Sequence, residues 1–216
     1  MTSLQLKQRT DSWVLATWDD YINQLNDPIY QQAKGYYYKG HMRIEMSPVS
    51  FDHGQDHVII IFAVNLFVAL KQIPATGLDT ATFRKTGVRE CQPDVAYYLG
   101  ESANTIPSGT GIVNLDQYPA PNLVIEIARS SLLDDLGIKR ALYEELGVNE
   151  YWVVDVQKAQ LLAYSMSNQG SQRIEVSQVL SGLEVAILEE ALQRSRQSNQ
   201  AEVGAWLLTQ FQHSKS

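Results

Sequence analysis

The chain has 216 residues, of which 44% are hydrophobic, and this length and composition suit one globular domain with a sizeable core. The formal net charge of −7 argues against a protein that only coats nucleic acid, because such proteins present a basic surface. An enzyme that holds cations between carboxylates is less constrained, since the metal ion itself supplies positive charge. The single cysteine, Cys91, excludes an internal disulfide and a cysteine-based zinc cluster within one chain, and we expect a buried thiol.

No segment is expected to cross a membrane. The longest apolar stretch, residues 58–70, is interrupted by Asn65 and is shorter than the roughly 18–20 residues of a membrane span. The first ten residues lack the apolar core of a signal peptide. We therefore expect a cytoplasmic protein with a single domain over residues 1–216, with its core at about 40–165 and a C-terminal strand and helix extension at about 170–212.

Local patterns predict a helix, a hairpin and a long helix in the first third of the chain. Thr17 and Asp20 resemble a capping box, so a short helix is expected to run through residues 21–22 and to end by Pro28. The runs on either side of Gly40 are typical of a β-hairpin. The hairpin strands are expected at 35–39 and 41–46, and the long helix at 52–73. Because most faces of the long helix are apolar, it should pack against a sheet.

The rest of the chain alternates apolar strands with helices. Pro74 and Gly77 indicate a break, residues 100–121 indicate a flexible loop, and Gly204 is expected to interrupt the last helix. The expected strands are 81–85, 95–98, 123–127, 150–156, 161–164 and 173–176, and the expected helices are 136–146 and 188–212. This order predicts an α/β (α+β) fold in which a mixed sheet is flanked by helices.

Two carboxylates stand out against these strands. Glu126 lies inside the apolar run 122–128, where a carboxylate loses its hydration unless a cation, a proton or several donors meet it. Asp94 follows Pro93 at the start of another apolar strand, although Pro-Asp pairs are also common in turns. Carboxylates on neighbouring strand ends can hold Mg²⁺, which activates a bound water. The alternative is a structural ion pair in which Arg129 or Lys139 neutralises Glu126.

A lysine follows on the next predicted helix. Lys139 shares a helix face with Leu136 and Tyr143, so its side chain is expected to point inward, toward the strand that carries Glu126. A lysine there can orient a water or stabilise the charge of a transition state. The alternative is a surface ion pair with Asp135, four residues earlier.

A pair of histidines at the start of the long helix admits a second kind of metal site. His53 and His57 have the spacing of a zinc pair, but the glutamate of the metalloprotease motif is missing between them. We interpret them as helix caps or hydrogen-bond donors.

The strings PDVAYY and NLVIEIARSSLLDDLGIKRALYEELGVNEYWVVDV, with GHMRIEMSPVSFDHG upstream, resemble the Uma-two family of restriction-endonuclease-like proteins over about residues 40–155. The resemblance implies a restriction endonuclease-like core of the PD-(D/E)XK nuclease superfamily. It implies that Asp94 is the first acid, Glu126 the second and Glu45 a candidate third; read alone, Glu45 is the outward residue of an exposed hairpin. Ala128 occupies the usual lysine position, and Lys139 would supply the lysine from the following helix.

Together these features predict an endonuclease that hydrolyses DNA phosphodiester bonds with Mg²⁺, or Mn²⁺, held by Asp94 and Glu126. Lys139 would orient the water or stabilise charge, and Glu45 would be an outer acid. One alternative is a binding or regulatory protein that keeps the fold without catalysis, and another is a hydrolase of a small phosphoester. Cleavage of both strands of a duplex calls for two sites, so we expect a homodimer. The tyrosines at 36–38 or the C-terminal helix with Trp206 would supply its apolar contact.

Overall fold

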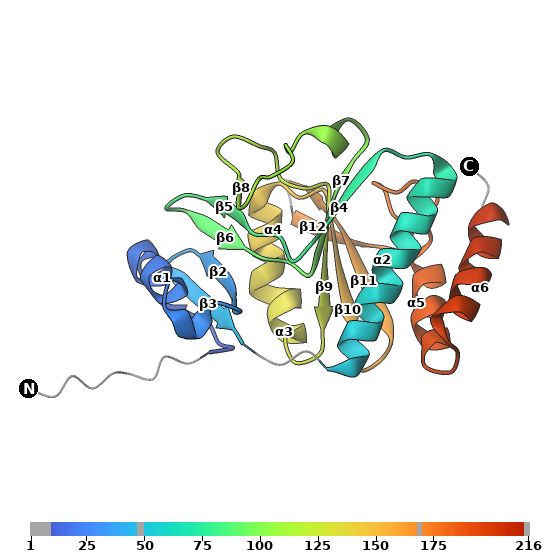
Figure 1. Cartoon of the computed structure of the whole chain (residues 1–216), viewed down its shortest axis with the longest axis horizontal. Helices are drawn as coiled ribbons and strands as arrows, with labels where there is room; N and C mark the ends of the chain where they lie inside the picture. Colours follow the sequence, from blue (N-terminus) through green and yellow to red (C-terminus); the bar gives the residue numbers. More distant parts are fainter. Residues whose placement is uncertain (1–9, 47–49, 168–169, 214–216) are drawn as a thin grey trace, which may run out of the picture.

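The computed structural model describes residues 10–46, 50–167 and 170–213, and over these residues the chain forms two mixed sheets with helices packed on them (Figure 1). The central sheet has the strand order β12-β11-β10-β9-β7-β4. Its strands are β4 (Ala75–Asp79), β7 (Val95–Leu99), β9 (Leu123–Ala128), β10 (Glu150–Asp155), β11 (Gln160–Ser167) and β12 (Gly170–Ile174). Strands β9 and β10 are parallel, and their neighbours are antiparallel, which confirms the predicted mixed sheet.

The second sheet, here called the hairpin sheet, has the order β1-β3-β2-β6-β5-β8. Its strands are β1 (Val14–Leu15), β2 (Lys34–Tyr38), β3 (His41–Glu45), β5 (Phe83–Lys85), β6 (Arg89–Cys91) and β8 (Val113–Asn114). The predicted hairpin about Gly40 is confirmed as β2 and β3, which pair in antiparallel register. Gly40 has φ +73°, a left-handed conformation that glycine adopts without strain. Helix α1 (Trp18–Leu25) begins at the predicted capping box, in which Thr17 and Asp20 bond each other's backbone amides.

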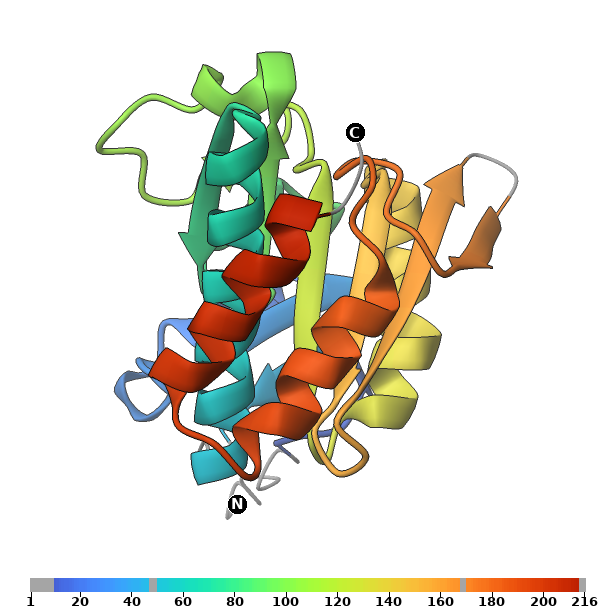
Figure 2. The ribbon, with the colours of Figure 1, turned by 90° about the vertical axis from the view of Figure 1, so that its right-hand side faces the viewer.

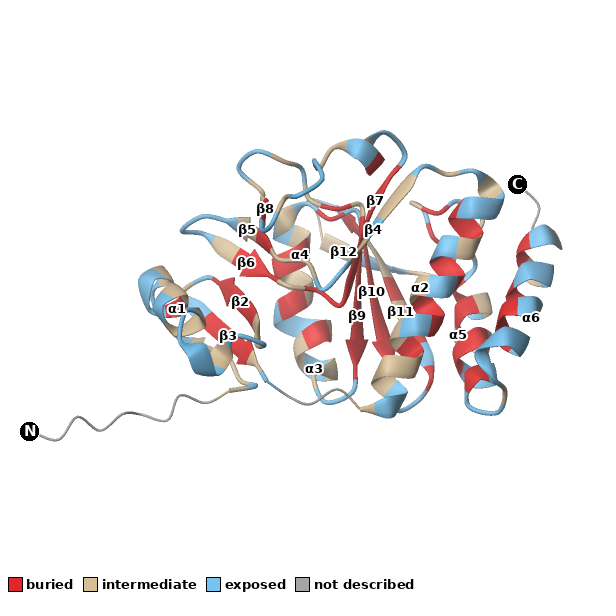
Figure 3. Ribbon diagram, in the orientation of Figure 1, coloured by how far each residue is buried: buried red, intermediate tan, exposed pale blue. Residues whose placement is uncertain are grey.

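Three helices cover one face of the central sheet, as Figure 2 shows: α2 (Phe51–Lys71), α5 (Val185–Ser195) and α6 (Gln200–His213). The other face carries α3 (Leu132–Asp134) and α4 (Arg140–Leu146), and beyond them the hairpin sheet (Figure 1). Buried residues follow the central strands and the inward faces of these helices (Figure 3). The hydrophobic core therefore lies on both faces of the central sheet, with one cluster beneath α2, α5 and α6 and a second between the two sheets.

Helix α2 has the length and composition of a membrane span, since it has 21 residues and contains an 18-residue window with a mean hydropathy of 1.4. Its packing accounts for that composition. Ile59, Ile60 and Ala63 are buried in the core cluster, and the helix contacts β9, α5 and α6. The prediction that this helix packs against a sheet is confirmed.

The structure corrects two sequence expectations in these elements and adds a strand that was not predicted. Gly77 does not mark a break but lies within β4, where a Cβ atom would come 2.7 Å from Tyr97 Cε1, so glycine allows the Tyr97 ring to lie over the strand. Gly204 does not interrupt a helix but lies inside α6, and the break falls earlier, between α5 and α6. The short strand β6 was not predicted, since two of its three residues, Arg89 and Glu90, are charged.

The tyrosines at 36–38 are also placed differently from one sequence expectation. Tyr36, Tyr37 and Tyr38 are 0–7% exposed and belong to the core. They therefore cannot supply an exposed apolar patch to a dimer contact, and that expectation was wrong.

Candidate active site

Asp94 and Glu126 lie on adjacent strands of the central sheet. The antiparallel register of β7 and β9 pairs Val95 with Ile125, so Asp94, one residue before β7, faces Glu126. Asp94 Oδ2 accepts a hydrogen bond of 2.7 Å from the amide of Ile127, which follows Glu126. Directly opposed residues of an antiparallel pair have Cα atoms about 4.5–5.5 Å apart. The two carboxylates thus share one site.

Glu126 is 2% exposed, and hydroxyl groups surround it. Tyr143 donates a hydrogen bond of 2.6 Å to Glu126 Oε1, and the Tyr36 hydroxyl lies 3.3 Å from the same oxygen. Burial raises the pKa of Glu126 to about 8, although the positive charge of Lys139 acts in the opposite direction. Glu126 is therefore a carboxyl group that holds a proton near neutral pH unless a further cation approaches it.

Asp94 has the opposite electrostatic environment. Burial by itself would raise its pKa, but a hydrogen bond from His53 and the adjacent Lys34 ammonium outweigh burial and lower that pKa below its ordinary value. Lys34 Nζ forms an ion pair with Asp94 Oδ1, and His53 Nε2 lies 3.7 Å from the same oxygen. Asp94 is thus an ionised acid beside a protonated one, a difference that separates the two carboxylates chemically.

Lys139 is 1% exposed and points into the site, the direction that the sequence predicted. Its Nζ lies 2.9 Å from Asp135 Oδ1, 3.0 Å from Glu45 Oε1 and 3.7 Å from Glu126 Oε1. The ammonium also lies 4.2 Å from the centre of the Tyr36 ring. Burial opposes the charge, but the three carboxylates raise the pKa of Lys139 above its ordinary value, so it stays protonated.

A π-helical turn, Asp135–Lys139, joins α3 to α4, so the helix begins earlier than the predicted residue 136. Such turns widen the helix and recur at functional sites. This turn brings Asp135 and Lys139 inward together, and Asp135 is 0% exposed. Ser131 donates a hydrogen bond of 2.6 Å to Asp135 Oδ2. The alternative of a surface pair between Asp135 and Lys139 was wrong, because the pair is buried.

Glu45 reaches the site from the hairpin sheet. It stands opposite Lys34 in the register of β2 and β3, so both side chains project from the same face. Glu45 Oε1 lies 2.7 Å from Arg43 Nε and 3.0 Å from Lys139 Nζ. Glu45 is therefore not an outward residue of an exposed hairpin, the reading that its position in the sequence suggested by itself.

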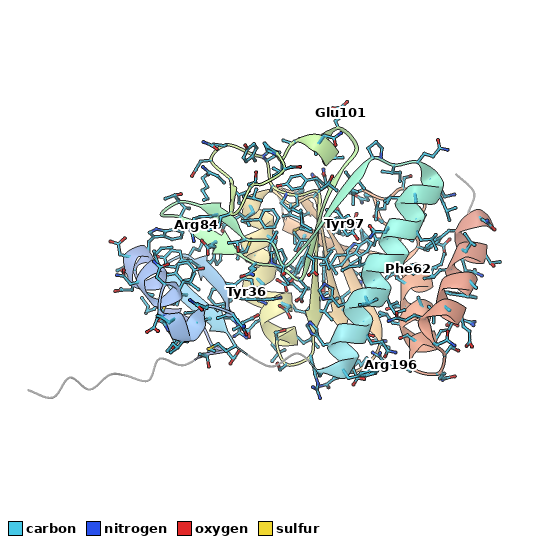
Figure 4. The ribbon with its side chains drawn as sticks, viewed as in Figure 1. Tyr36, Phe62, Arg84, Tyr97, Glu101 and Arg196 are labelled. Atoms are coloured by element: carbon cyan, nitrogen blue, oxygen red, sulfur yellow. The ribbon has the colours of Figure 1, made fainter. Side chains whose placement is uncertain are left out.

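A cavity of about 670 Å³ lies between the two sheets and the N-terminal end of α2. All four sequence-predicted site residues line it: Glu45, Asp94, Glu126 and Lys139. Five further basic side chains line it as well: Lys34, Arg43, His53, His57 and Arg129. Figure 4 shows Tyr36 between the hairpin sheet and the helix that carries Lys139. The structure thus brings together Glu45, Asp94, Glu126 and Lys139, while their chemical roles stay predictions.

Sequence patterns missed three residues of the site: Lys34, which lines the cavity, and Tyr36 and Asp135, which contact Lys139. Lys34 and Tyr36 belong to a strand whose pattern indicated only a hairpin, and Asp135 looked like a surface residue. Side chains alternate between the two faces of a strand, so Lys34 and Tyr36 of β2 lie on the same face. This alternation is the pattern from which both could have been assigned to the site. No local pattern could have placed Lys34 beside Asp94, because 60 residues separate them.

The site contains more acidic side chains than lysine and arginine side chains that bind them. Four carboxylates, Glu45, Asp94, Glu126 and Asp135, are held by the ammonium or guanidinium groups of Lys34, Arg43 and Lys139. Arg43 also binds Asp134, at 2.9 Å. The four acids thus outnumber the three ammonium and guanidinium groups that bind them. Burial is the main cause of the raised pKa of Glu126, and the negative charges of Asp94 and Asp135 add to it.

Asp94 and Glu126 fit a magnesium ion in their chemistry. Mg²⁺ prefers oxygen ligands, and one or two carboxylates commonly hold it while waters and substrate phosphates fill the other positions. Within residues 10–46, 50–167 and 170–213, no group of three or more His, Cys, Asp or Glu side chains is disposed to hold a metal ion. A metal bound here would therefore rest on two protein carboxylates, and its affinity would be modest.

The mixed sheet and this cavity define a protein with a nuclease-like fold. A solved structure with that fold is the crystal structure of a putative nuclease belonging to DUF820 from Anabaena variabilis ATCC 29413, with a TM-score of 0.59 and 16% sequence identity. The match covers 82% of this chain and 98% of the other. At that identity the likeness shows the fold alone.

The chain belongs to the Uma2 family, described as "Putative restriction endonuclease", whose family model matches residues 18–202. The resemblance that the motifs indicated is thereby confirmed. No protein with curated annotation matches the chain.

Proposed function

We propose that the protein is an endonuclease that hydrolyses DNA phosphodiester bonds with Mg²⁺, or Mn²⁺, held between Asp94 and Glu126. The observation that carries this proposal is the pair of facing carboxylates in a cavity where buried acids outnumber the cations that bind them. A proton compensates Glu126 in the metal-free protein, and a divalent ion would compensate the carboxylate once that proton is lost. Membership of a family described as restriction endonucleases favours DNA as the substrate.

The proposed roles of the four side chains follow from their different environments. Asp94, ionised at neutral pH, and Glu126, once it loses its proton, would hold the ion, which activates a water and neutralises charge at phosphorus. Lys139, fixed by three carboxylates, would stabilise negative charge from inside the site. Glu45 would act as an outer acid that keeps Lys139 and Arg43 in place.

One observation favours a second candidate, a binding or regulatory protein without catalysis. Lys34 forms an ion pair with Asp94, and Lys139 lies 3.7 Å from Glu126, so both acids already have a cationic side chain nearby without a metal ion. This candidate predicts that divalent ions do not bind and that the acids serve stability alone.

A plasmid-nicking assay with Mg²⁺ or Mn²⁺ tests the proposal. Wild-type protein should nick and linearise the plasmid, and Asp94→Ala and Glu126→Ala should each abolish the reaction, because each removes one of two ligands. Glu101→Ala is the matched control, since it removes an exposed carboxylate far from the site (Figure 4). Its activity should equal that of the wild type.

Two further measurements separate the candidates. Calorimetry should detect divalent binding at millimolar metal for the wild type and not for the two acid variants. Absence of both cleavage and divalent binding in the wild type would establish the binding-protein candidate instead. Hydrolysis of bis(p-nitrophenyl) phosphate without plasmid cleavage would point to a small phosphoester.

A further inference from the structure

The cavity contains two lysines that differ in how tightly the protein holds them. Lys139 is 1% exposed and lies within 4 Å of three carboxylates. Its ammonium also rests on the Tyr36 ring. Withdrawing it would leave the buried side chains of Glu126 and Asp135 without a cation, because among the described residues only Glu45 has a second partner, in Arg43. Lys139 is therefore fixed as an internal counter-ion.

Lys34 is held much more loosely. The side chain is 24% exposed and lines the cavity, and among the described residues its ion pair is with Asp94 alone. It projects from the first residue of β2, next to the connection from α1, on a flexible four-carbon stem. Lys34 can therefore move its ammonium by several ångströms while its backbone stays in the sheet.

Lys34 also occupies the place that a divalent ion would need. Its ammonium rests on Asp94 Oδ1, while Asp94 Oδ2 is already used by the amide of Ile127. A cation that binds Asp94 must therefore compete with the ammonium for Oδ1. The released ammonium would remain in the cavity, within reach of the phosphate of a bound substrate, to which it can donate a charge-assisted hydrogen bond.

We propose that Lys34 is the substrate-contacting lysine of this site: it competes with the divalent ion for Asp94 and binds the DNA phosphodiester when it is displaced. This inference rests on the proposed function and assigns the phosphate contact to a residue of the hairpin sheet. Lys139 then supports the site without touching the substrate.

The inference predicts effects of opposite sign in a single variant. Lys34→Met removes a positive charge beside Asp94, so divalent binding should become about tenfold tighter, since close like charges oppose each other. The same variant loses a phosphate contact, so DNA affinity should fall by about tenfold, and the slope of log affinity against log salt should become shallower by about 0.9. A folding defect would weaken both kinds of binding.

The experiment uses the full chain and two readouts that do not depend on cleavage. Mn²⁺ binding is measured by calorimetry. DNA binding is measured by fluorescence anisotropy over a salt series in millimolar Mg²⁺, with a labelled duplex whose phosphorothioate linkages slow hydrolysis. Lys34→Arg keeps the charge and should restore most of the DNA affinity and leave Mn²⁺ binding near the wild-type value.

Lys39→Met is the matched control, because it removes the same charge from the turn that follows the far end of β2. The strand β2 spans about 13 Å at the rise of an extended strand, and Lys39 beyond its end is 65% exposed and pairs with Glu145. It should leave both affinities unchanged. Equal loss of DNA affinity in Lys39→Met and Lys34→Met would overturn the inference by showing a general effect of surface charge.

Other results overturn it as directly. If Lys34→Met changes neither affinity or weakens both, Lys34 is a structural partner of Asp94 and no more. Should Mn²⁺ bind neither the wild type nor Lys34→Met, the competition does not exist. The proposed function fails separately: wild-type protein that binds Mn²⁺ and DNA without cleaving leaves the role of Lys34 intact and removes only the catalysis.

Discussion

The hydroxyl of Tyr143 donates a hydrogen bond of 2.6 Å to Oε1 of Glu126, and both side chains are sealed from solvent. Helix α4, which follows the π-helical turn, thus fixes the carboxyl group of Glu126 on β9 through this hydrogen bond. This contact joins the two elements that the candidate site depends on most, and it gives the first prediction.

Tyr143→Phe should lower the free energy of unfolding by roughly 1–3 kcal/mol, because it leaves a buried carboxyl oxygen with one donor fewer. Tyr38→Phe is the control: its hydroxyl also donates at 2.6 Å, but to Glu145, which is 37% exposed and can turn to water. Urea unfolding of the three proteins gives the comparison. Equal losses in the two variants would contradict the idea that Glu126 depends on its buried partners.

Stability should depend on pH through Glu126. In the unfolded chain its pKa is near 4.5, whereas burial raises the pKa of the folded carboxyl to about 8. The stability that the proton provides is therefore fully present below pH 4.5 and is lost as pH rises through 8, by up to about 1.4 kcal/mol per pH unit. Burial also raises the pKa of Asp135, and this contribution is shared by wild type and variant.

The measurement is the free energy of unfolding in EDTA between about pH 5 and pH 8 for wild type and Glu126→Gln. The wild type should lose stability relative to the variant across this window, because glutamine does not titrate. Parallel curves would show that Glu126 is ionised throughout and that its neighbours compensate its charge.

Arg196 ties the end of α5 to the start of α2, the helix segment that carries His53 into the cavity (Figure 4). Its Nη2 lies 2.6 Å from Oδ2 of Asp56, which is 0% exposed. Arg196→Met should therefore cost about 3 kcal/mol, since it leaves a buried carboxylate without its partner. Adding Asp56→Asn should recover at least half of that loss in urea unfolding.

The control for Arg196 lies two residues earlier on the same helix. Arg194 pairs with Glu190, and both side chains are 45% exposed, so Arg194→Met should cost about 1 kcal/mol or less, including its contact with the Trp206 ring. A loss at Arg194 as large as that at Arg196 would mean that charge alone, and not the buried partner, decides the effect.

Of the two apolar surfaces that the sequence offered for the expected homodimer, the C-terminal helix is left after the burial of the tyrosines. A groove of about 460 Å³ runs between α2 and α6 and is lined by Val58, Phe62, Leu66 and Leu208, with Phe62 exposed between the two helices (Figure 4). We expect a two-fold dimer through this groove. Leu208→Glu should give the mass of a monomer by light scattering, while Leu133→Glu, at an 86% exposed residue on another surface, should not. A wild-type monomer at micromolar concentration would refute the dimer.

The sequence by itself determined the local elements, because their patterns are local. The capping box of α1, the glycine of the hairpin, the apolar length of α2 and the acid inside β9 all depend on residues within a few positions of one another. The same locality explains the errors. Glycine considered alone indicates a break in a strand. The tertiary structure shows why it lies within β4: the Tyr97 ring of the neighbouring strand occupies the space that a side chain at Gly77 would need.

The tertiary structure alone decided which residues of the hairpin sheet complete the candidate site. Sequence placed Asp94, Glu126 and Lys139 on adjoining elements, but the order of strands in the hairpin sheet decided that Lys34 and Glu45 face them across one cavity. Contacts between residues far apart in the chain follow from sheet order and packing, and no short pattern encodes these. The buried excess of acid over cation is likewise a property of the assembled cavity: Glu126 is unusual within its own strand, but Glu45, Lys34 and Asp135 resemble ordinary surface charges when their own segments are considered alone.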